Sequence, residues 1–180
     1  MLILYNCLIV PYLTYGNIIW GSTYHRRLNP LITKQKQAIR LVFKTNHHAH
    51  TRPIFTNLKL LNFTNISLYQ TAIFMYKFHN NLLPECFNDY FALNDRIHDH
   101  DTRSSKNYHL SYIRTDFAKF SIKYQGSICW NSLPCNLKTS HSFLYFKTRF
   151  KMYLLELQEA ATVSWNNYMH TVVTVDGVSD

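Results

Sequence analysis

The sequence predicts a mainly α-helical protein, a helical bundle with a small α+β C-terminal half. Gly and Pro number only 4 and 5 among 180 residues, fewer than the tight turns of an all-β sandwich or barrel require. Charged residues make up 16% and apolar residues 47%, a composition that favours a folded core over disorder. Apolar residues also recur at helical spacing over long stretches, and these three observations together favour packed helices.

The only sustained polar stretch, residues 94–107, divides the chain. We expect a helical region over residues 1–93, a polar loop over 94–107 and a C-terminal region over 108–160 that ends in an amphipathic helix. Over residues 161–180 the hydrophobic pattern dissolves, which is typical of a tail.

Residues 2–20 are almost continuously apolar and are broken only by Pro11 and Gly16. A helix that is apolar on every side needs cover all round, so we expect part of this segment to dock on a partner. Pro11 and Tyr12 interrupt the run before it spans a bilayer, and the segment lacks the basic leader of a signal peptide. We therefore expect no membrane association.

Residues 26–44 show the clearest amphipathic pattern. Arg26, Lys36, Arg40 and Lys44 are expected to align along one edge of this helix, beside its apolar stripe, with no acidic residue between them. Seven residues form the stripe: Leu28, Leu31, Ile32, Gln35, Ile39, Val42 and Phe43.

Further helices are predicted along the chain. Pro53 suits the first turn of a short helix that runs to about residue 59. A long helix over residues 64–79, with Thr64 as its N-cap, carries apolar residues on several sides and is expected at the centre of the fold.

The C-terminal region combines three kinds of pattern. Residues 108–120 alternate loosely and predict one or two short strands, whereas residues 121–130 favour a helix. The last helix, capped by Ser142, places five apolar residues on one face: Phe143, Phe146, Phe150, Leu154 and Leu157.

Residues for catalysis are not found together in the sequence. No Ser or Cys follows a glycine-flanked elbow, and the glycines are too scattered to hold a phosphate. The segment from His98 to Asp101 allows a metal-dependent hydrolase as one hypothesis, but it lacks a rigid element and a second ligand cluster. We therefore expect no catalytic residue, no metal and no cofactor.

The four cysteines form no Cys-x-x-Cys pair and are interpreted as buried, reduced thiols of an intracellular protein of the nucleus or cytoplasm. The net charge of +9 favours polyanionic partners. Lys and Arg on a rigid helix can neutralise phosphates, and Tyr24 and His25 just ahead of them can stack on exposed bases. The same cations are also typical of an ordinary solvated helix face in a basic protein.

Several segments together resemble the stretch that follows the polymerase palm in reverse transcriptases of non-LTR (LINE-type, jockey-like) retrotransposons. The first is Leu8-Ile9-Val10-Pro11-Tyr12-Leu13-Thr14-Tyr15-Gly16 with Ile19-Trp20-Gly21, followed by Gln35-Lys36-Gln37-Ala38-Ile39-Arg40. Further blocks follow in the same order: Thr51-Arg52-Pro53-Ile54-Phe55, Phe74-Met75-Tyr76-Lys77, Asn81-Leu82-Leu83-Pro84, His100-Asp101-Thr102-Arg103, Gly126 with Trp130-Asn131-Ser132-Leu133-Pro134, and Phe146-Lys147.

In that family the first two helices correspond to the thumb, which packs on the palm and grips template RNA and the growing DNA strand. The resemblance therefore implies a thumb-like bundle with Gln35, Lys36 and Arg40 on the thumb helix, and a palm against residues 2–20. The Tyr-x-Asp-Asp-like motif of the palm is absent. We expect a truncated copy that acts at most as a non-catalytic module for template RNA or an RNA/DNA hybrid. The alternative is a helical protein-interaction module that docks through its apolar N-terminal segment.

Overall fold

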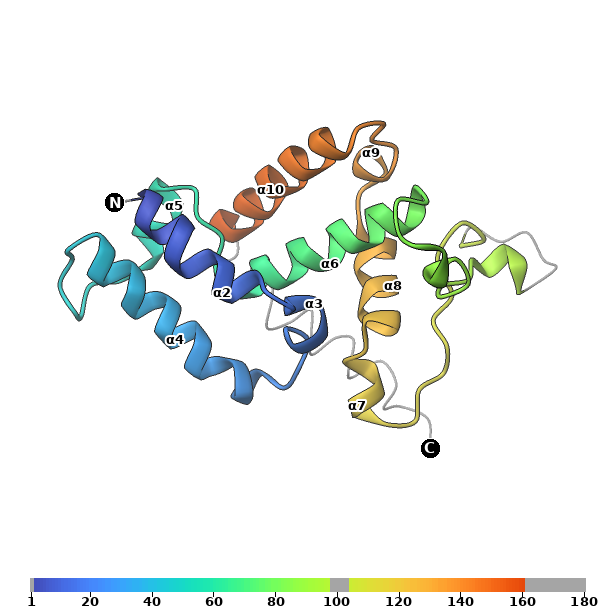
Figure 1. Ribbon diagram of the computed structural model, residues 1–180, viewed down its shortest axis with the longest axis horizontal. Helices are drawn as coiled ribbons and strands as arrows, with labels where there is room; N and C mark the ends of the chain where they lie inside the picture. Colours follow the sequence, from blue (N-terminus) through green and yellow to red (C-terminus); the bar gives the residue numbers. More distant parts are fainter. Residues whose placement is uncertain (1, 98–103, 161–180) are drawn as a thin grey trace.

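The computed structural model describes residues 2–97 and 104–160, and this part of the chain consists of helices and the loops that join them (Figure 1). The mainly α fold expected from the sequence is confirmed. The expected β contribution over residues 108–120 is wrong, because the only β pairing among the described residues is an isolated bridge between Leu93 and Tyr108. The neighbour of Tyr108 is a helix, and the side chain of Asn131 pairs with both backbone groups of Tyr108 at 2.9 and 2.8 Å. Around the bridge the N–H of His109 donates to Ala92 O at 2.8 Å and the N–H of Asn94 donates to Asn107 O at 2.9 Å, but this pairing does not extend into a strand.

The apolar N-terminal segment forms short consecutive helical pieces rather than one rod. Pro11 directly follows a π-helical turn in which the N–H of Val10 donates to Tyr5 O. Gly16 separates two pieces with a φ of 60°, a left-handed conformation that favours glycine. Across this turn the indole N–H of Trp20 donates to the carbonyl of Tyr15 at 2.8 Å. The pieces are α1 (Leu2–Leu4), the π-helical turn η1 (Tyr5–Ile9), α2 (Val10–Thr14) and α3 (Asn17–Trp20).

Helix α4 (His25–Val42) forms from the amphipathic segment predicted over residues 26–44. It ends earlier than predicted because Lys44, with a φ of 51°, begins a Schellman turn. In this turn the N–H of Lys44 donates to Leu41 O at 3.2 Å, and the N–H of Thr45 donates to Arg40 O at 3.0 Å. The short helix α5 (Arg52–Asn57) follows, with Pro53 in its first turn as expected.

Helix α6 (Phe63–His79) lies at the centre of the fold and is contacted by α2, α3 and α4 as well as by the C-terminal helices (Figure 1). Its N-cap is Asn62, not Thr64 as predicted. The Asn62 side chain accepts a hydrogen bond from the Asn65 N–H at 2.9 Å, which satisfies one of the unpaired donors of the first turn. The Asn62 N–H donates in turn to Gln158 Oε1 at 3.0 Å, so this cap also joins α6 to the end of the last helix.

The C-terminal helices are α7 (Asp116–Lys119), α8 (Ile122–Ser132), α9 (Cys135–Lys138) and α10 (Phe143–Ala160). Two of them, α8 and α10, pack against α6, while α7 packs against α8 and α9 against α10. Gly126 lets α8 approach α6 closely, since a Cβ at this position would lie 2.7 Å from the sulfur of Met75 and 3.3 Å from the ring of Phe91. The intervening loops contain the short 3₁₀ turns η2 (Glu85–Phe87) and η3 (Asn94–Arg96).

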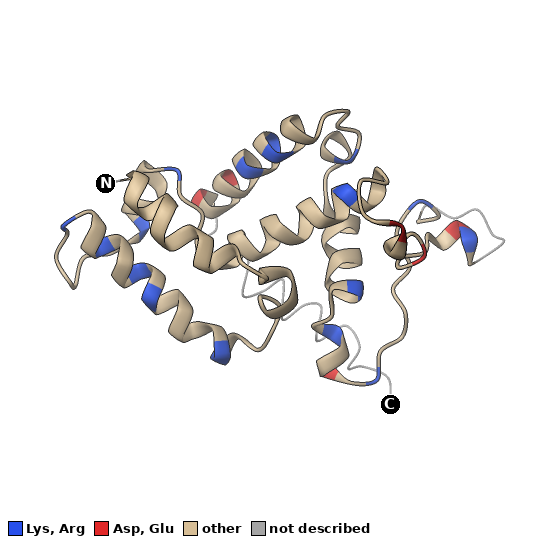
Figure 2. Ribbon diagram, viewed as in Figure 1, with Lys and Arg blue, Asp and Glu red and all other residues tan. Residues whose placement is uncertain are grey.

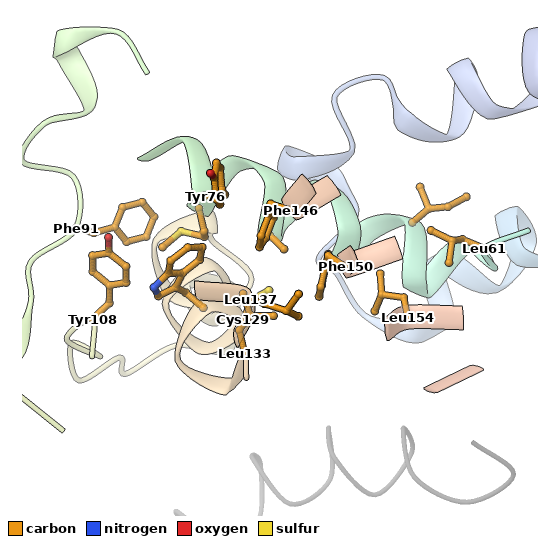
Figure 3. Packing of buried hydrophobic residues seen from close by; sticks show 14 of the residues in the cluster. Leu61, Tyr76, Phe91, Tyr108, Cys129, Leu133, Leu137, Phe146, Phe150 and Leu154 are labelled. Atoms are coloured by element: carbon orange, nitrogen blue, oxygen red, sulfur yellow. The ribbon is translucent and has the colours of Figure 1, made fainter. Parts of the chain in front are cut away.

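One main hydrophobic core joins the N-terminal and C-terminal parts of the described chain (Figure 3). Tyr76 of α6 stacks on Phe146 of α10 at 4.4 Å between ring centroids, and its hydroxyl donates to Ser140 O at 2.8 Å. Leu13 of α2 belongs to the same core. A second, smaller cluster lies beneath the C-terminal half of α4 and consists of Tyr5, Ile39, Phe55 and Leu60.

Candidate nucleic-acid interface

Buried contacts fix which side of α4 faces solvent. The side-chain amide of Gln35 donates to the Tyr5 hydroxyl at 2.9 Å and to Leu61 O at 3.1 Å, and all of these groups are buried. Ile39, one turn further along, is fully buried in the second cluster. Because residues four apart share a helix face, these anchors leave the opposite face of α4 in solvent. Three further residues pack partly against the main core: Leu28, Leu31 and Ile32.

Helix α4 contains Lys and Arg along its length but no Asp or Glu (Figure 2). Arg26 and Lys36 of the predicted site are exposed here. Arg27 and Lys34 are exposed as well, but the sequence prediction missed them. At 100° per residue they lie at the edge of the solvent side that is farthest from Lys36, and so outside the predicted row. We call these four residues the basic face of α4: Arg26, Arg27, Lys34 and Lys36.

The two other predicted residues differ from them in environment. Arg40 is half-buried, and its Nε donates to the carbonyl of Ala49 at 2.9 Å. Its guanidinium therefore holds the loop that follows α4. Lys44 is exposed but lies beyond the helix, in the Schellman turn, so its direction is not set by the helical periodicity. The expected single row of four cations is therefore interrupted at Arg40.

The charge of the chain is distributed unevenly along the sequence. Residues 1–84 contain nine Lys and Arg but no Asp or Glu, whereas residues 85–180 contain ten of each sign. The whole net charge of +9 thus belongs to the first 84 residues. This asymmetry is a sequence signal that marks the N-terminal part as the basic part of the chain. In the first turn of α4, Arg26 and Arg27 add to the positive end of the helix dipole.

Three basic residues on other helices, Arg52, Lys147 and Lys151, do not belong to the basic face of α4. Arg52 donates to the carbonyl of Glu159 at 3.3 Å, which links α5 to the end of α10. On α10 the ammonium of Lys147 lies 5.4 Å from the centroid of the Phe143 ring, and Lys151 is exposed. Helix α10 lies on the opposite side of α6 from α4, so its cations belong to a different surface of the molecule (Figure 2).

Tyr24, the residue before α4, and His25, the first residue of α4, are both exposed. Tyr24 precedes the first turn and provides no side-chain cap. Its ring lies edge-on against that of Phe120, at 4.6 Å between centroids and 71° between planes. This contact places the N-terminal end of α4 next to the end of α7, although the two residues are far apart in the sequence.

A polar and aromatic cluster lies at the other end of α6. His79 Nδ1 and the Tyr108 hydroxyl form a hydrogen bond of 3.0 Å, and the His79 ring lies 4.9 Å from that of Trp130. Burial lowers the pKa of His79, and the charge of Lys138 lowers it further. Burial raises the pKa of Tyr108 to about 12, although Arg96 acts in the opposite direction. A tyrosine with this pKa keeps its proton at neutral pH. Its hydroxyl joins α6 to the loop at Tyr108, and the backbone of Tyr108 pairs with Asn131 of α8.

Other predicted features are not assembled into a site. Within residues 2–97 and 104–160, no group of three His, Cys, Asp or Glu side chains is arranged to hold a metal ion. His47, His48 and His50 are exposed in the loop after α4. The segment from His98 to Asp101, on which the hydrolase hypothesis rests, lies outside the described residues.

The N-terminal segment presents an apolar face to solvent. Leu8, Tyr12, Tyr15 and Ile19 follow each other at spacings of three or four residues, and 58 to 85% of each is exposed. Ile3 extends the series at 76% exposure. We call these five residues the apolar N-terminal face. A concentration of exposed apolar residues is typical of an interaction site.

Comparisons with known proteins identified no relative of this chain, since no protein-family model, curated protein or solved structure matches it. Among the described residues, no helix has the length and hydrophobicity to cross a membrane.

Proposed function

We propose that this chain binds RNA or DNA through the basic face of α4 and performs no chemistry on it. The observation that carries the proposal is the confinement of the net charge to residues 1–84, with exposed cations along a rigid helix. Such a surface binds phosphates by releasing the condensed counterions of the nucleic acid. Binding of this kind is independent of base sequence and depends steeply on salt.

The proposal also covers the evolutionary origin of the chain. A nucleic-acid-binding helical module is the role that the resemblance to the thumb of a non-LTR retrotransposon reverse transcriptase implies, with template RNA or an RNA/DNA hybrid as ligand. An intracellular location in the nucleus or cytoplasm accompanies this role. An independent test is the DNA upstream of the coding sequence, where the proposal expects a reading frame with a Tyr-x-Asp-Asp-like motif. An ordinary promoter with no such frame would contradict this origin.

The binding surface is tested by the salt dependence of affinity. Fluorescence anisotropy with a labelled oligonucleotide of about 20 residues would be measured from about 50 to 200 mM salt. We expect the logarithm of the affinity to fall linearly with the logarithm of the salt concentration. The double variant Lys34→Ala/Lys36→Ala removes two phosphate contacts, and should reduce the slope by about 0.7 per contact for a single strand or about 0.9 for a duplex.

The matched control is Arg149→Ala/Lys151→Ala, which removes the same charge from α10 on the opposite side of α6. We expect this variant to keep the slope of the wild type. If both double variants reduce the slope equally, overall charge rather than the basic face of α4 explains the binding. A slope near zero for the wild type would contradict the proposed function itself.

A second candidate function is supported by a different observation, the apolar N-terminal face. In this reading the chain docks on a protein partner through residues such as Leu8 and Ile19. Replacement of both by Ser should abolish the complex with an identified partner, while Lys34→Ala/Lys36→Ala leaves that complex intact. The opposite result would favour nucleic acid as the ligand.

A further inference from the structure

Two aromatic side chains near α7 are unusually exposed. Tyr112, in the loop before the helix, is 94% exposed, and Phe117, within α7, is 84% exposed. Aromatic residues of this size normally provide core or interface contacts, because burial of their rings is strongly favourable. Both rings therefore present their faces to solvent within a stretch of six residues.

The end of α7 lies next to the N-terminal end of α4. The contact between Tyr24 and Phe120 joins the residue before α4 to the residue after α7. Figure 1 shows α7 on the side of the molecule toward which the N-terminal end of α4 points. The exposed cations Arg26 and Arg27 occupy that end of α4. Helix α7, which carries Phe117, thus lies beside the end of α4 that carries Arg26 and Arg27.

The charges around the two rings are compatible with a polyanion. Arg114 is exposed between Tyr112 and Phe117 in the sequence. The one carboxylate of this stretch, Asp116, pairs with Lys119 at 3.5 Å. Lys119 therefore offsets its charge, and Arg114 leaves the stretch with a positive balance.

We propose that Tyr112 and Phe117 stack on the unpaired bases of a single-stranded nucleic acid whose phosphates contact the basic face of α4. This inference rests on the proposed function and deepens it by naming the class of substrate. In a duplex the bases stack on one another and cannot reach the rings, whereas in a single strand each base offers a free face. A single strand matches both the exposed rings and the positive balance of this stretch.

The test compares a single strand and a duplex of the same length, bound to matched variants. In the double variant Tyr112→Ala/Phe117→Ala, we expect the affinity for the single strand to fall about 5-fold or more, since one stacked base is worth about 5- to 150-fold. The affinity for the duplex and the salt slope should stay unchanged, because no phosphate contact is lost. The conservative variant Phe117→Tyr keeps a stacking ring and should bind the single strand like the wild type.

Each result separates this inference from the proposed function. Equal binding of the single strand by Tyr112→Ala/Phe117→Ala and the wild type would overturn the stacking and leave the basic face of α4 as the binding surface. An equal loss for single strand and duplex would also overturn it. If the wild type binds neither, both proposals fail. Self-association that the double variant abolishes, with oligonucleotide binding unchanged, would assign the rings to a protein contact instead. Because both rings are exposed, we expect the variants to unfold at the urea midpoint of the wild type.

Discussion

The side-chain amide of Gln35 donates a hydrogen bond of 2.9 Å to the hydroxyl of Tyr5, and both groups are buried. The same nitrogen donates to the carbonyl of Leu61 at 3.1 Å, so one side chain joins α4 to η1 and to the loop before α6. This contact sets the rotation of α4 about its axis. It thereby determines which cations of the helix reach solvent.

Loss of this amide should destabilise the protein. Gln35→Ala leaves two buried acceptors without their donor, and each unsatisfied group costs about 1 to 3 kcal/mol. We expect a decrease of at least this size in the free energy of unfolding, measured by urea denaturation. The control Gln37→Ala changes the same residue type on the exposed side of α4, and should stay within about 0.5 kcal/mol of the wild type. Equal effects of the two changes would show that the buried contact contributes nothing.

A charge reversal in the first turn of α4 should raise the stability of the protein and weaken oligonucleotide binding. Arg27 lies at the positive end of the helix dipole, with no acidic residue in that turn. Arg27→Glu should therefore raise the free energy of unfolding by about 0.3 to 1 kcal/mol at low salt. The same change places a negative charge on the basic face of α4 and should weaken oligonucleotide binding.

The matched control for Arg27→Glu is Lys36→Glu, near the middle of the same helix. It should weaken oligonucleotide binding similarly but bring no gain in stability, because the dipole effect is confined to the terminal turns. Urea denaturation and fluorescence anisotropy measure the two quantities separately. A loss of stability in Arg27→Glu would contradict the dipole argument.

The stability of the protein should depend on the protonation of His79. Burial and the charge of Lys138 lower the pKa of His79 from its ordinary value of 6.5. As the pH falls through 6.5, the unfolded chain takes up a proton before the folded protein does. Stability is therefore lost until the pH passes below the lowered pKa, and this contribution is constant beyond that point.

The measurement compares the wild type with His79→Asn, whose amide still offers an acceptor to the Tyr108 hydroxyl. Urea denaturation would be followed at about pH 7.5 and at about pH 5. We expect the variant to lose less stability on acidification than the wild type, whatever its absolute stability. An identical loss in both proteins would show that His79 does not contribute to the pH dependence.

The four cysteines should react in two classes. Cys7, Cys86 and Cys135 are exposed, so the expectation that all four thiols are buried is wrong for these three. Cys129 is buried in the main core, and burial raises its pKa to about 12. Because the thiolate is the reactive form, a thiol reagent should label the three exposed residues in the native protein and Cys129 only after unfolding. Mass spectrometry of the labelled peptides checks this, and labelling of native Cys129 at the rate of Cys86 would contradict it.

The helix prediction succeeded where the pattern was local and strongly periodic. Helix α4 differs from its predicted range by one residue at the start and two at the end. The central position of α6 was also predicted, because a helix with apolar residues on several sides must be covered. Its cap was assigned wrongly, since both Asn62 and Thr64 suit the position and only the observed bond from the Asn65 N–H distinguishes them.

The candidate interface was predicted only in part. Arg26 and Lys36 lie on the basic face of α4, but the row was extended through Arg40 as though every position at that spacing were equivalent. Arg40 differs because the loop after α4 folds back and offers the Ala49 carbonyl as an acceptor. Helical periodicity contains no information about that loop. The exposed rings of Tyr112 and Phe117 were missed for a similar reason, since the loose alternation around them predicted strands.

The sequence alone determined that this protein is mainly helical, that α4 is amphipathic and that the net charge lies in the first 84 residues. These properties depend on residue type and short-range spacing, which are present in the sequence before the chain folds. Only the tertiary structure decided which cations remain at the surface and which surfaces meet. The contacts that decide this, from Gln35 to Tyr5 and from Tyr24 to Phe120, join residues far apart in the chain, and their free energy exists only once the core has formed.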